Sequence, residues 1–247
     1  MYRPIEPENQ EIDTRLIWAG LFFSLAIFSK FPIIDVLVLS KFYIPGTGFL
    51  HASNGLVASM YTWLPRMASS VISAVVGMWL VAALAGQKVD RLWTRLGAHQ
   101  GPDLKRTREI ALLAMTVLLL APGLISYLSQ QPFMIRPTPD TLQVFGGSEI
   151  FWGIFEQGTI GAHGTSRINV ASAMGFALMA LGMSCEIDWK RRWLQIGLLT
   201  GSAIGLAGML LGKVFLSDVI FAFYLVWISY VLTAKWVMPW LNPARHA

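Results

Sequence analysis

The chain alternates between long apolar segments and shorter stretches in which polar residues, proline and glycine gather. A helix needs about 20 apolar residues to cross the hydrocarbon core of a bilayer. Segments of roughly this length predict membrane-spanning helices at residues 16–39, 67–85, 110–128, 170–185, 193–211 and 215–237. The pattern therefore predicts an all-α polytopic membrane protein, built as a six-transmembrane-helix bundle within a single domain, residues 1–247.

The connections between these segments differ in character. Residues 40–65 mix aromatic, glycine and polar positions, which indicates an interfacial segment with turns and room for a short amphipathic helix. Residues 129–167 contain several prolines and glycines and predict a long irregular loop region. Residues 87–108 form a basic polar loop, and residues 186–192 form a short charged one.

Basic residues divide unevenly between the two sides of the predicted bundle. The N-terminal segment, the 87–108 and 186–192 loops and the C-terminal end hold 13 of the 19 Lys and Arg residues, and the other side holds 6. Loops with an excess of Lys and Arg stay in the cytoplasm. We therefore expect a multi-pass protein of the inner (cytoplasmic) membrane, with both termini cytoplasmic and the 129–167 loop on the outer face.

Composition supports the membrane assignment and excludes several kinds of chemistry. Hydrophobic residues make up 55% of the chain and charged residues 13%, against about 25% charged in soluble domains. The single cysteine, Cys185, excludes a disulfide framework, a multi-thiolate zinc site and an iron–sulfur cluster. The four histidines show no metal-ligand spacing. We expect no metal, no cofactor and no nucleic-acid partner.

Three segments at the outer face carry the residues from which a site could be built. They read QPFMIRPTPDTLQVFGG at 131–147, HGTSRINVASAMGFALM at 163–179 and GMLLGKVFLSDVIFAF at 208–223. Each joins an outer loop to the mouth of a predicted helix, where irregular backbone is tolerated because it lines a wet cavity.

These segments resemble the type 2 phosphatidic acid phosphatase superfamily, most closely its lipid A phosphatase-like branch. That family carries K-x-x-x-x-x-x-R-P, then P-S-G-H, then S-R-x-x-x-x-x-H-x-x-x-D. The matches are Arg136-Pro137 with the glycines that follow, the run 172–176, the stretch 212–219 and, upstream, the segment 31–35. The resemblance covers roughly residues 31–227. It implies a six-helix bundle with an active site at one membrane face.

The residues that perform the family's reaction are replaced in this chain. In the family one histidine attacks phosphorus, a second with its aspartate transfers protons, and a lysine and two arginines hold the phosphate. The resemblance places Ser129 at the lysine, Ala171 (or, with a one-residue shift, Val170) at the acid–base histidine, Ala207-Gly208 at the S-R pair and Val214 at the nucleophile. A phosphohistidine route needs both imidazoles. The resemblance therefore implies the fold without its reaction.

The polar residues left near this site each have two interpretations. Arg136 either binds a phosphate head group, because a guanidinium forks onto phosphate oxygens, or pairs with Asp140 or Asp218. Asp218 is either a functional group at the helix mouth or a carboxylate favoured by a helix N-terminus. Arg167 and Lys213 either line a remnant anion or lipid site or snorkel to the interface. If the pocket has collapsed, we expect Arg136 to pair with Asp218.

Two functions of different classes are compatible with this pattern. The first is a catalytically inactive phosphatase-fold protein, acting as a structural or accessory subunit of a membrane complex or as a lipid-binding factor. Its partners would be membrane lipids and other membrane-protein subunits. The alternative is an active lipid phosphatase on lipid A, isoprenyl diphosphate or phosphatidic acid, with atypical catalytic residues such as His163. A transporter or channel is disfavoured, since no span has a charged midpoint.

Overall fold

The computed structural model describes residues 14–85, 115–117, 119–128, 135–156, 164–182 and 187–233. This part of the chain is mostly helical. The all-α class that the sequence predicts is therefore confirmed, with two short two-stranded sheets added to the helices.

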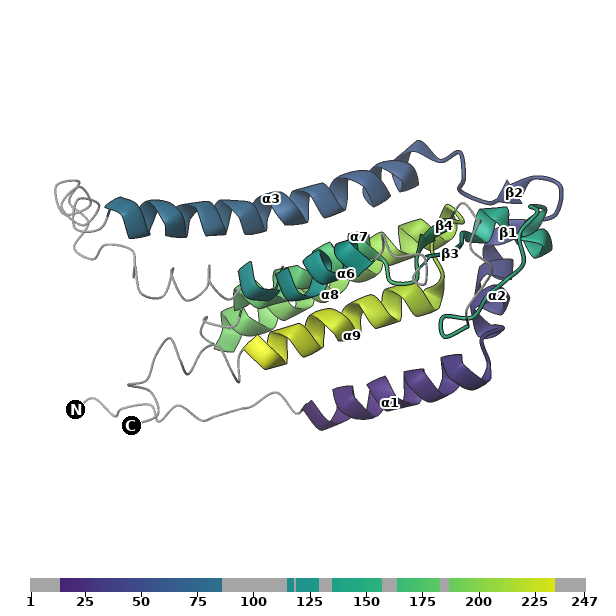
Figure 1. Cartoon of the computed structure of the whole chain (residues 1–247). Coiled ribbons are helices and arrows are strands. Elements are labelled where there is room, and N and C mark those ends of the chain that lie inside the picture. Colours follow the sequence, from purple (N-terminus) through teal and green to yellow (C-terminus); the bar gives the residue numbers. More distant parts are fainter. Residues whose placement is uncertain are drawn as a thin grey trace.

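The long helices run roughly along one axis (Figure 1). α7 (Val170–Ala177), α8 (Ile187–Leu210) and α9 (Leu216–Leu232) pack together in the middle of the molecule. α3 (Gly55–Ala85) lies along one side and contacts α7 and α8, and α1 (Thr14–Lys30) lies along the other side and contacts α9. Elements far apart in sequence therefore share one end of the bundle.

Among the described residues, most of the irregular structure gathers at that end, which we call the hairpin end (Figure 1). It begins with α2 (Ile34–Leu39), the 3-10 turn η1 (Ser40–Phe42) and the antiparallel pair β1 (Tyr43–Ile44) and β2 (Gly48–Phe49). A second antiparallel pair joins β3 (Ile135–Pro137) to β4 (Gly164–Ser166), and the 3-10 turns η4 (Pro139–Thr141) and η5 (Gln143–Phe145) follow β3. The described part of the 129–167 region is thus irregular, as the sequence predicts.

Two helices depart from regular α geometry inside the bundle. A π-helical turn, η2 (Leu119–Gly123), leads into α6 (Leu124–Leu128), and it contains Pro122. Proline has no backbone N–H, which interrupts the α-helical hydrogen-bond ladder at this point. α7 in turn continues as the 3-10 segment η6 (Leu178–Gly182).

The first predicted span, residues 16–39, is wrong as one continuous helix. α1 ends at Lys30, and the next helical segment turns away from it by 93°. Pro32 lies in the break between them. Because proline lacks an N–H donor and disfavours helical backbone in the residue before it, the helix stops there.

The predicted interfacial segment, residues 40–65, is also wrong in its second half. α3 starts at Gly55 rather than near residue 67. The Asn54 side chain accepts hydrogen bonds from the backbone N–H groups of Leu56 and Val57, at 3.0 and 3.3 Å. An N-cap asparagine of this kind satisfies donors that the first helical turn leaves free, so the helix begins about three turns early.

α8 is the helix that best fits a membrane span. It begins at Ile187, so the cations of the predicted 186–192 loop lie on its first turns. Among the described residues, its segment Asp188–Leu210 is long and apolar enough to cross a membrane, and the bent pair α1–α2 is a second such segment if it is counted as one span.

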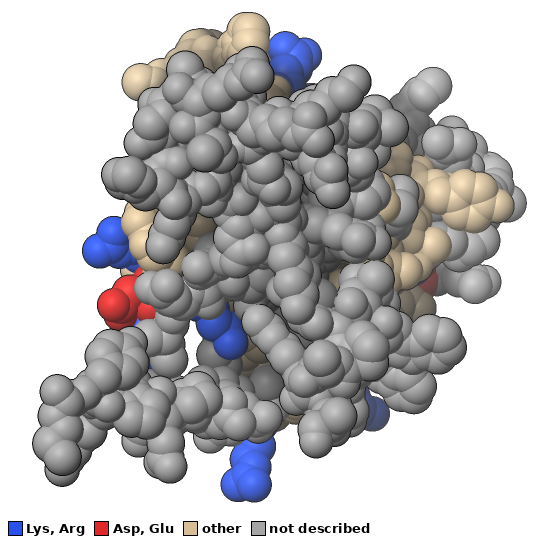
Figure 2. Space-filling view, turned by 90° about the vertical axis from the view of Figure 1, so that its left-hand side faces the viewer, with Lys and Arg blue, Asp and Glu red and all other residues tan. Residues whose placement is uncertain are grey.

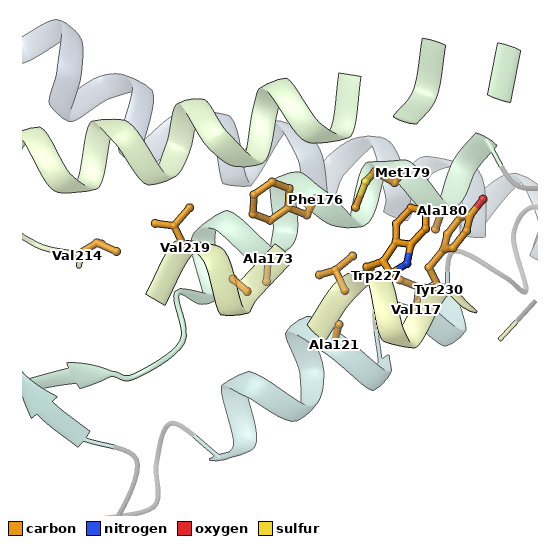
Figure 3. Packing of buried hydrophobic residues seen from close by; sticks show 12 residues of the cluster. Val117, Ala121, Ala173, Phe176, Met179, Ala180, Val214, Val219, Trp227 and Tyr230 are labelled. Carbon is orange, nitrogen blue, oxygen red and sulfur yellow. The ribbon is translucent and has the colours of Figure 1, made fainter. Parts of the chain in front are cut away.

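The main apolar core lies between α7, α8, α9 and the segment around η2 (Figure 3). Phe176, Met179 and Trp227 are each almost fully buried within it. Glycines bring α7 and α8 close together: a Cβ added at Gly175 would lie 2.7 Å from the backbone of Gly201. The helices therefore touch backbone to backbone at this crossing.

Candidate functional site

A buried polar cluster lies at the hairpin end, where α2, β3 and the first turn of α9 meet. Its members are Asp35, Arg136, Ser217 and Asp218, each at most 1% exposed. Arg136 Nη2 lies 2.8 Å from Asp218 Oδ1 and 3.4 Å from Asp35 Oδ2. The same nitrogen donates to Ser217 Oγ at 2.9 Å. One buried cation thus faces two buried carboxylates.

Asp35 and Phe215 complete the surroundings of the guanidinium. Asp35 accepts hydrogen bonds from the backbone N–H of Ser217 at 2.9 Å and from its hydroxyl at 2.5 Å. Arg136 Nη1 donates to the Trp152 carbonyl at 3.3 Å. The Phe215 ring lies under the guanidinium carbon, 3.9 Å from the ring centroid. The guanidinium group is therefore occupied by protein on several sides.

These contacts decide between the interpretations left open for Arg136 and Asp218. Arg136 pairs with Asp218, as we expected for a collapsed pocket, and not with Asp140. Asp218 also accepts from the backbone N–H of Phe215 at 3.1 Å. The carboxylate therefore closes the start of α9 as well as neutralising Arg136.

Two of the positions expected to carry the family's catalytic groups, Gly208 and Val214, lie against each other, and the contact between them is apolar. A Cβ added at Gly208 would lie 2.7 Å from Val214 Cγ2 and 2.8 Å from Tyr61 Cε2. Val214 is 4% exposed and belongs to the main core (Figure 3). Tyr61 and Val170 pack against this core. Ala171 is partly buried in α7. The Gly208 and Val214 positions therefore present no imidazole and no other polar side chain.

Arg167 lies buried near the cluster instead of reaching the surface, so the expectation that it snorkels is wrong. It is 6% exposed, and its Nη1 donates to the Ile154 carbonyl at 2.8 Å. Burial, and next the positive charge of Arg136, lower the pKa of Arg167 below its ordinary value. Among the described residues, neither its Nε nor the Nδ2 of Asn169 has a hydrogen-bond partner, and buried donors of this kind are commonly satisfied by ordered water.

Lys213 is separate from the other three residues of the expected remnant site. Its ammonium pairs with Asp140, and both side chains are partly exposed, at 50% and 31%. The Thr138 hydroxyl also donates to Asp140. The expected site is therefore divided into a buried cluster around Arg136 and a surface pair at Lys213.

Two further candidates lie outside the described residues, namely Ser129 and His163. Among the residues that the structure describes, no group of three or more His, Cys, Asp and Glu side chains is placed to hold a metal ion. Sequence reasoning assigned no role to Asp35. Its position within the apolar run IIDVLVL could have identified it as part of a buried polar cluster, because ionisable residues in such segments are costly and usually paired.

Comparison with known proteins adds no relative. The chain matches no protein-family model, no curated protein and no solved structure at a significant level.

Proposed function

We propose that this chain is a catalytically inactive, phosphatase-fold membrane protein that acts as a structural or accessory subunit of a membrane complex. The packing at Val214 carries the proposal. The position expected for the nucleophile is an apolar side chain in contact distance of Gly208 and Tyr61. Covalent phosphoryl transfer requires a nucleophile at that point, and none of these three residues supplies an imidazole.

The charges around Arg136 support the same proposal. Catalysis of phosphoryl transfer depends on preorganised cations and donors aimed at the phosphoryl oxygens. Here Asp35 and Asp218 already neutralise the guanidinium. Two carboxylates within 3.4 Å of it repel an incoming phosphate, so the cluster favours holding the hairpin end together over binding an anion.

Exposed apolar side chains on α1, α3 and α8 support contact of these three helices with a membrane. α1 exposes Phe22 and Phe23, α3 exposes Leu56 and Met67, and α8 exposes Leu199, each by more than 60%. Large apolar side chains exposed on several helices at once are expected where a surface contacts lipid or another protein. We infer that these helices face the inner membrane or a partner subunit within it.

The distribution of cations supports cytoplasmic termini. Lys190, Arg191 and Arg192 lie on the first turns of α8, at the end of the bundle opposite to the hairpin end. Figure 2 views the molecule from that end, and Lys and Arg side chains of described residues are visible on it. The positive-inside rule then assigns this end to the cytoplasm and the hairpin end to the outer face.

The test of inactivity measures phosphate release by the purified protein. We expect no release above background from phosphatidic acid, isoprenyl diphosphate or lipid A, with an active phosphatase of the resembled family assayed in the same detergent as the positive control. Turnover that is lost in His163→Ala would instead establish the alternative, an active lipid phosphatase with atypical residues.

The test of the accessory role measures the particle that contains the chain. After extraction in a mild detergent, we expect the protein to migrate in a complex larger than its own 27.4 kDa and any detergent belt. Mass spectrometry of that particle should identify at least one other membrane protein at a fixed ratio. A chain that migrates alone at every detergent concentration contradicts the accessory role.

A further inference from the structure

A cavity of about 580 Å³ opens at the hairpin end, between β1–β2, the start of α3 and the turn from α8 to α9. We call it the hairpin cavity. Phe49, Ala58, Tyr61 and Leu211 are among the residues that line it, and Asp140 and Lys213 belong to its wall. Small-molecule sites are typically about 300–1,000 Å³, mostly apolar, with a few polar groups that orient the ligand. The hairpin cavity fits that description.

The aromatic wall of this cavity is held in place by its own packing. The rings of Tyr43, Phe49 and Phe145 contact one another with centroids 5.0–5.4 Å apart. Gly212 has a φ of +71°, and a Cβ there would lie 2.4 Å from the Phe49 ring. Only glycine allows this close approach. The turn at Gly212 therefore packs directly against the Phe49 ring and limits the movement of both. The cavity is preformed rather than a gap between mobile loops.

The charged groups of the cavity favour a ligand head that carries both signs. Lys213 and Asp140 pair with each other at its wall, and together they contribute no net charge. A purely anionic head would be attracted by Lys213 but repelled by the Asp140 carboxylate. A zwitterionic head can replace the pair by matching its phosphate to Lys213 and its ammonium to Asp140, each through charge-assisted hydrogen bonds.

We propose that the hairpin cavity binds a zwitterionic, amine-headed phospholipid, with an acyl chain in the apolar part and the head group at Lys213 and Asp140. The inference rests on the proposed function, because it requires the hairpin end to lie at a lipid–water interface. The proposed lipid site is separate from Arg136, whose guanidinium is already paired with protein carboxylates.

The experiment counts lipids retained by the full-length protein after transfer from nanodiscs into detergent, by native mass spectrometry. Nanodiscs contain phosphatidylethanolamine and phosphatidylglycerol in equal amounts. We expect one retained phosphatidylethanolamine per chain. Ala58→Trp fills the cavity and should lower retention about tenfold, equivalent to about 1.4 kcal/mol. The matched control is Ala26→Trp, at an exposed position of α1 outside the cavity.

Charge variants test the head-group assignment without altering the core. Asp140→Asn should abolish the preference for phosphatidylethanolamine over phosphatidylglycerol, because it removes the carboxylate that attracts the ammonium and repels an anionic head. Lys213→Gln should lower the retention of both lipids, because it removes the cation that binds the phosphate they share. Lys41→Gln, an exposed lysine of η1, should change neither. Equal retention by Ala58→Trp and wild type would overturn the proposal, as would an unchanged preference in Asp140→Asn or unchanged retention in Lys213→Gln. A photoreactive residue at position 58 that crosslinks to protein and not to lipid would also overturn it. Phosphate release, in contrast, would refute the proposed inactivity whichever lipid is retained.

Discussion

Arg136 shows how a single side chain can be retained while its chemical role changes. Its guanidinium lies in van der Waals contact with Phe215 and within ion-pair distance of Asp35 and Asp218. Burying charges costs several kcal/mol per ion, and good geometry with additional hydrogen bonds offsets that cost. Ser217 supplies such hydrogen bonds on both sides, because its hydroxyl donates to Asp35 and accepts from Arg136.

Removal of Arg136 should destabilise the fold strongly. Arg136→Met leaves two buried carboxylates close together without a cation, and breaking a buried pair in this way costs about 3–5 kcal/mol. Thermal unfolding in detergent measures the change. The control Lys213→Gln breaks the partly exposed pair with Asp140 and should cost at most about 1 kcal/mol. Equal melting temperatures for the two variants would show that the buried cluster does not stabilise the protein.

At this scale the sequence predicts part of the cluster and misses the rest. The Arg136–Asp218 pair is predictable, because both residues stand at helix or loop positions that converge on one face. The place of Asp35 in the cluster, and the contact of Tyr61 with the Gly208 position, are not predictable from the sequence. Asp35 reaches Ser217 only because the chain bends by 93° after α1, and Tyr61 reaches Gly208 only because α3 begins early. Both contacts depend on tertiary arrangement that local pattern does not encode.

Glycines allow α7 and α8 to pack closely, and a substitution at their crossing tests how much this close packing contributes to stability. Gly175→Ala places a methyl group 2.7 Å from the Gly201 backbone, which cannot rotate away. Overpacking of this kind costs about 1–3 kcal/mol. We expect the free energy of unfolding of Gly175→Ala to fall by that amount in detergent denaturation.

The matched control for this prediction is Gly77→Ala in α3. A Cβ at Gly77 meets nothing within 4 Å. Alanine is favoured over glycine inside a helix by about 0.5–1 kcal/mol, so this variant should be neutral or slightly more stable than wild type. If both variants destabilise equally, the loss reflects glycine replacement in general and not the α7–α8 crossing.

Element boundaries show where the sequence pattern is informative and where it is not. Apolar length locates the start of α9 well, at Leu216 against a predicted 215, but it misses the start of α8, which begins at Ile187 and includes the charged segment predicted as a loop. Pro32 and Pro65 act differently although they are the same residue: the first ends a helix, and the second lies inside α3. Asn54 caps α3 and commits the following residues to the helix, whereas the break at Pro32 is stabilised by Asp35 docking on α9.

Orientation in the membrane belongs to the whole molecule, and labelling of single cysteines tests it. In a Cys185→Ser background, a cysteine at Gln143 should react with an impermeant maleimide added to spheroplasts, because this exposed residue lies at the hairpin end. A cysteine at Asp188, exposed at the start of α8, should react only after lysis. Reporter fusions near Gln143 and after His246 should agree. The reverse pattern contradicts cytoplasmic termini.

The contact between Asp35 and Ser217 also sets an order of events during synthesis. The two residues are 182 positions apart, and at about 5–20 residues per second translation needs roughly 10–40 s to cover that distance. During this interval the Asp35 carboxylate is already made while its final hydrogen-bond donors are not. Completion of the cluster therefore requires that α9 has docked. A chain that stops before α9 leaves Asp35 without its two hydrogen bonds from Ser217 and Arg136 without Asp218.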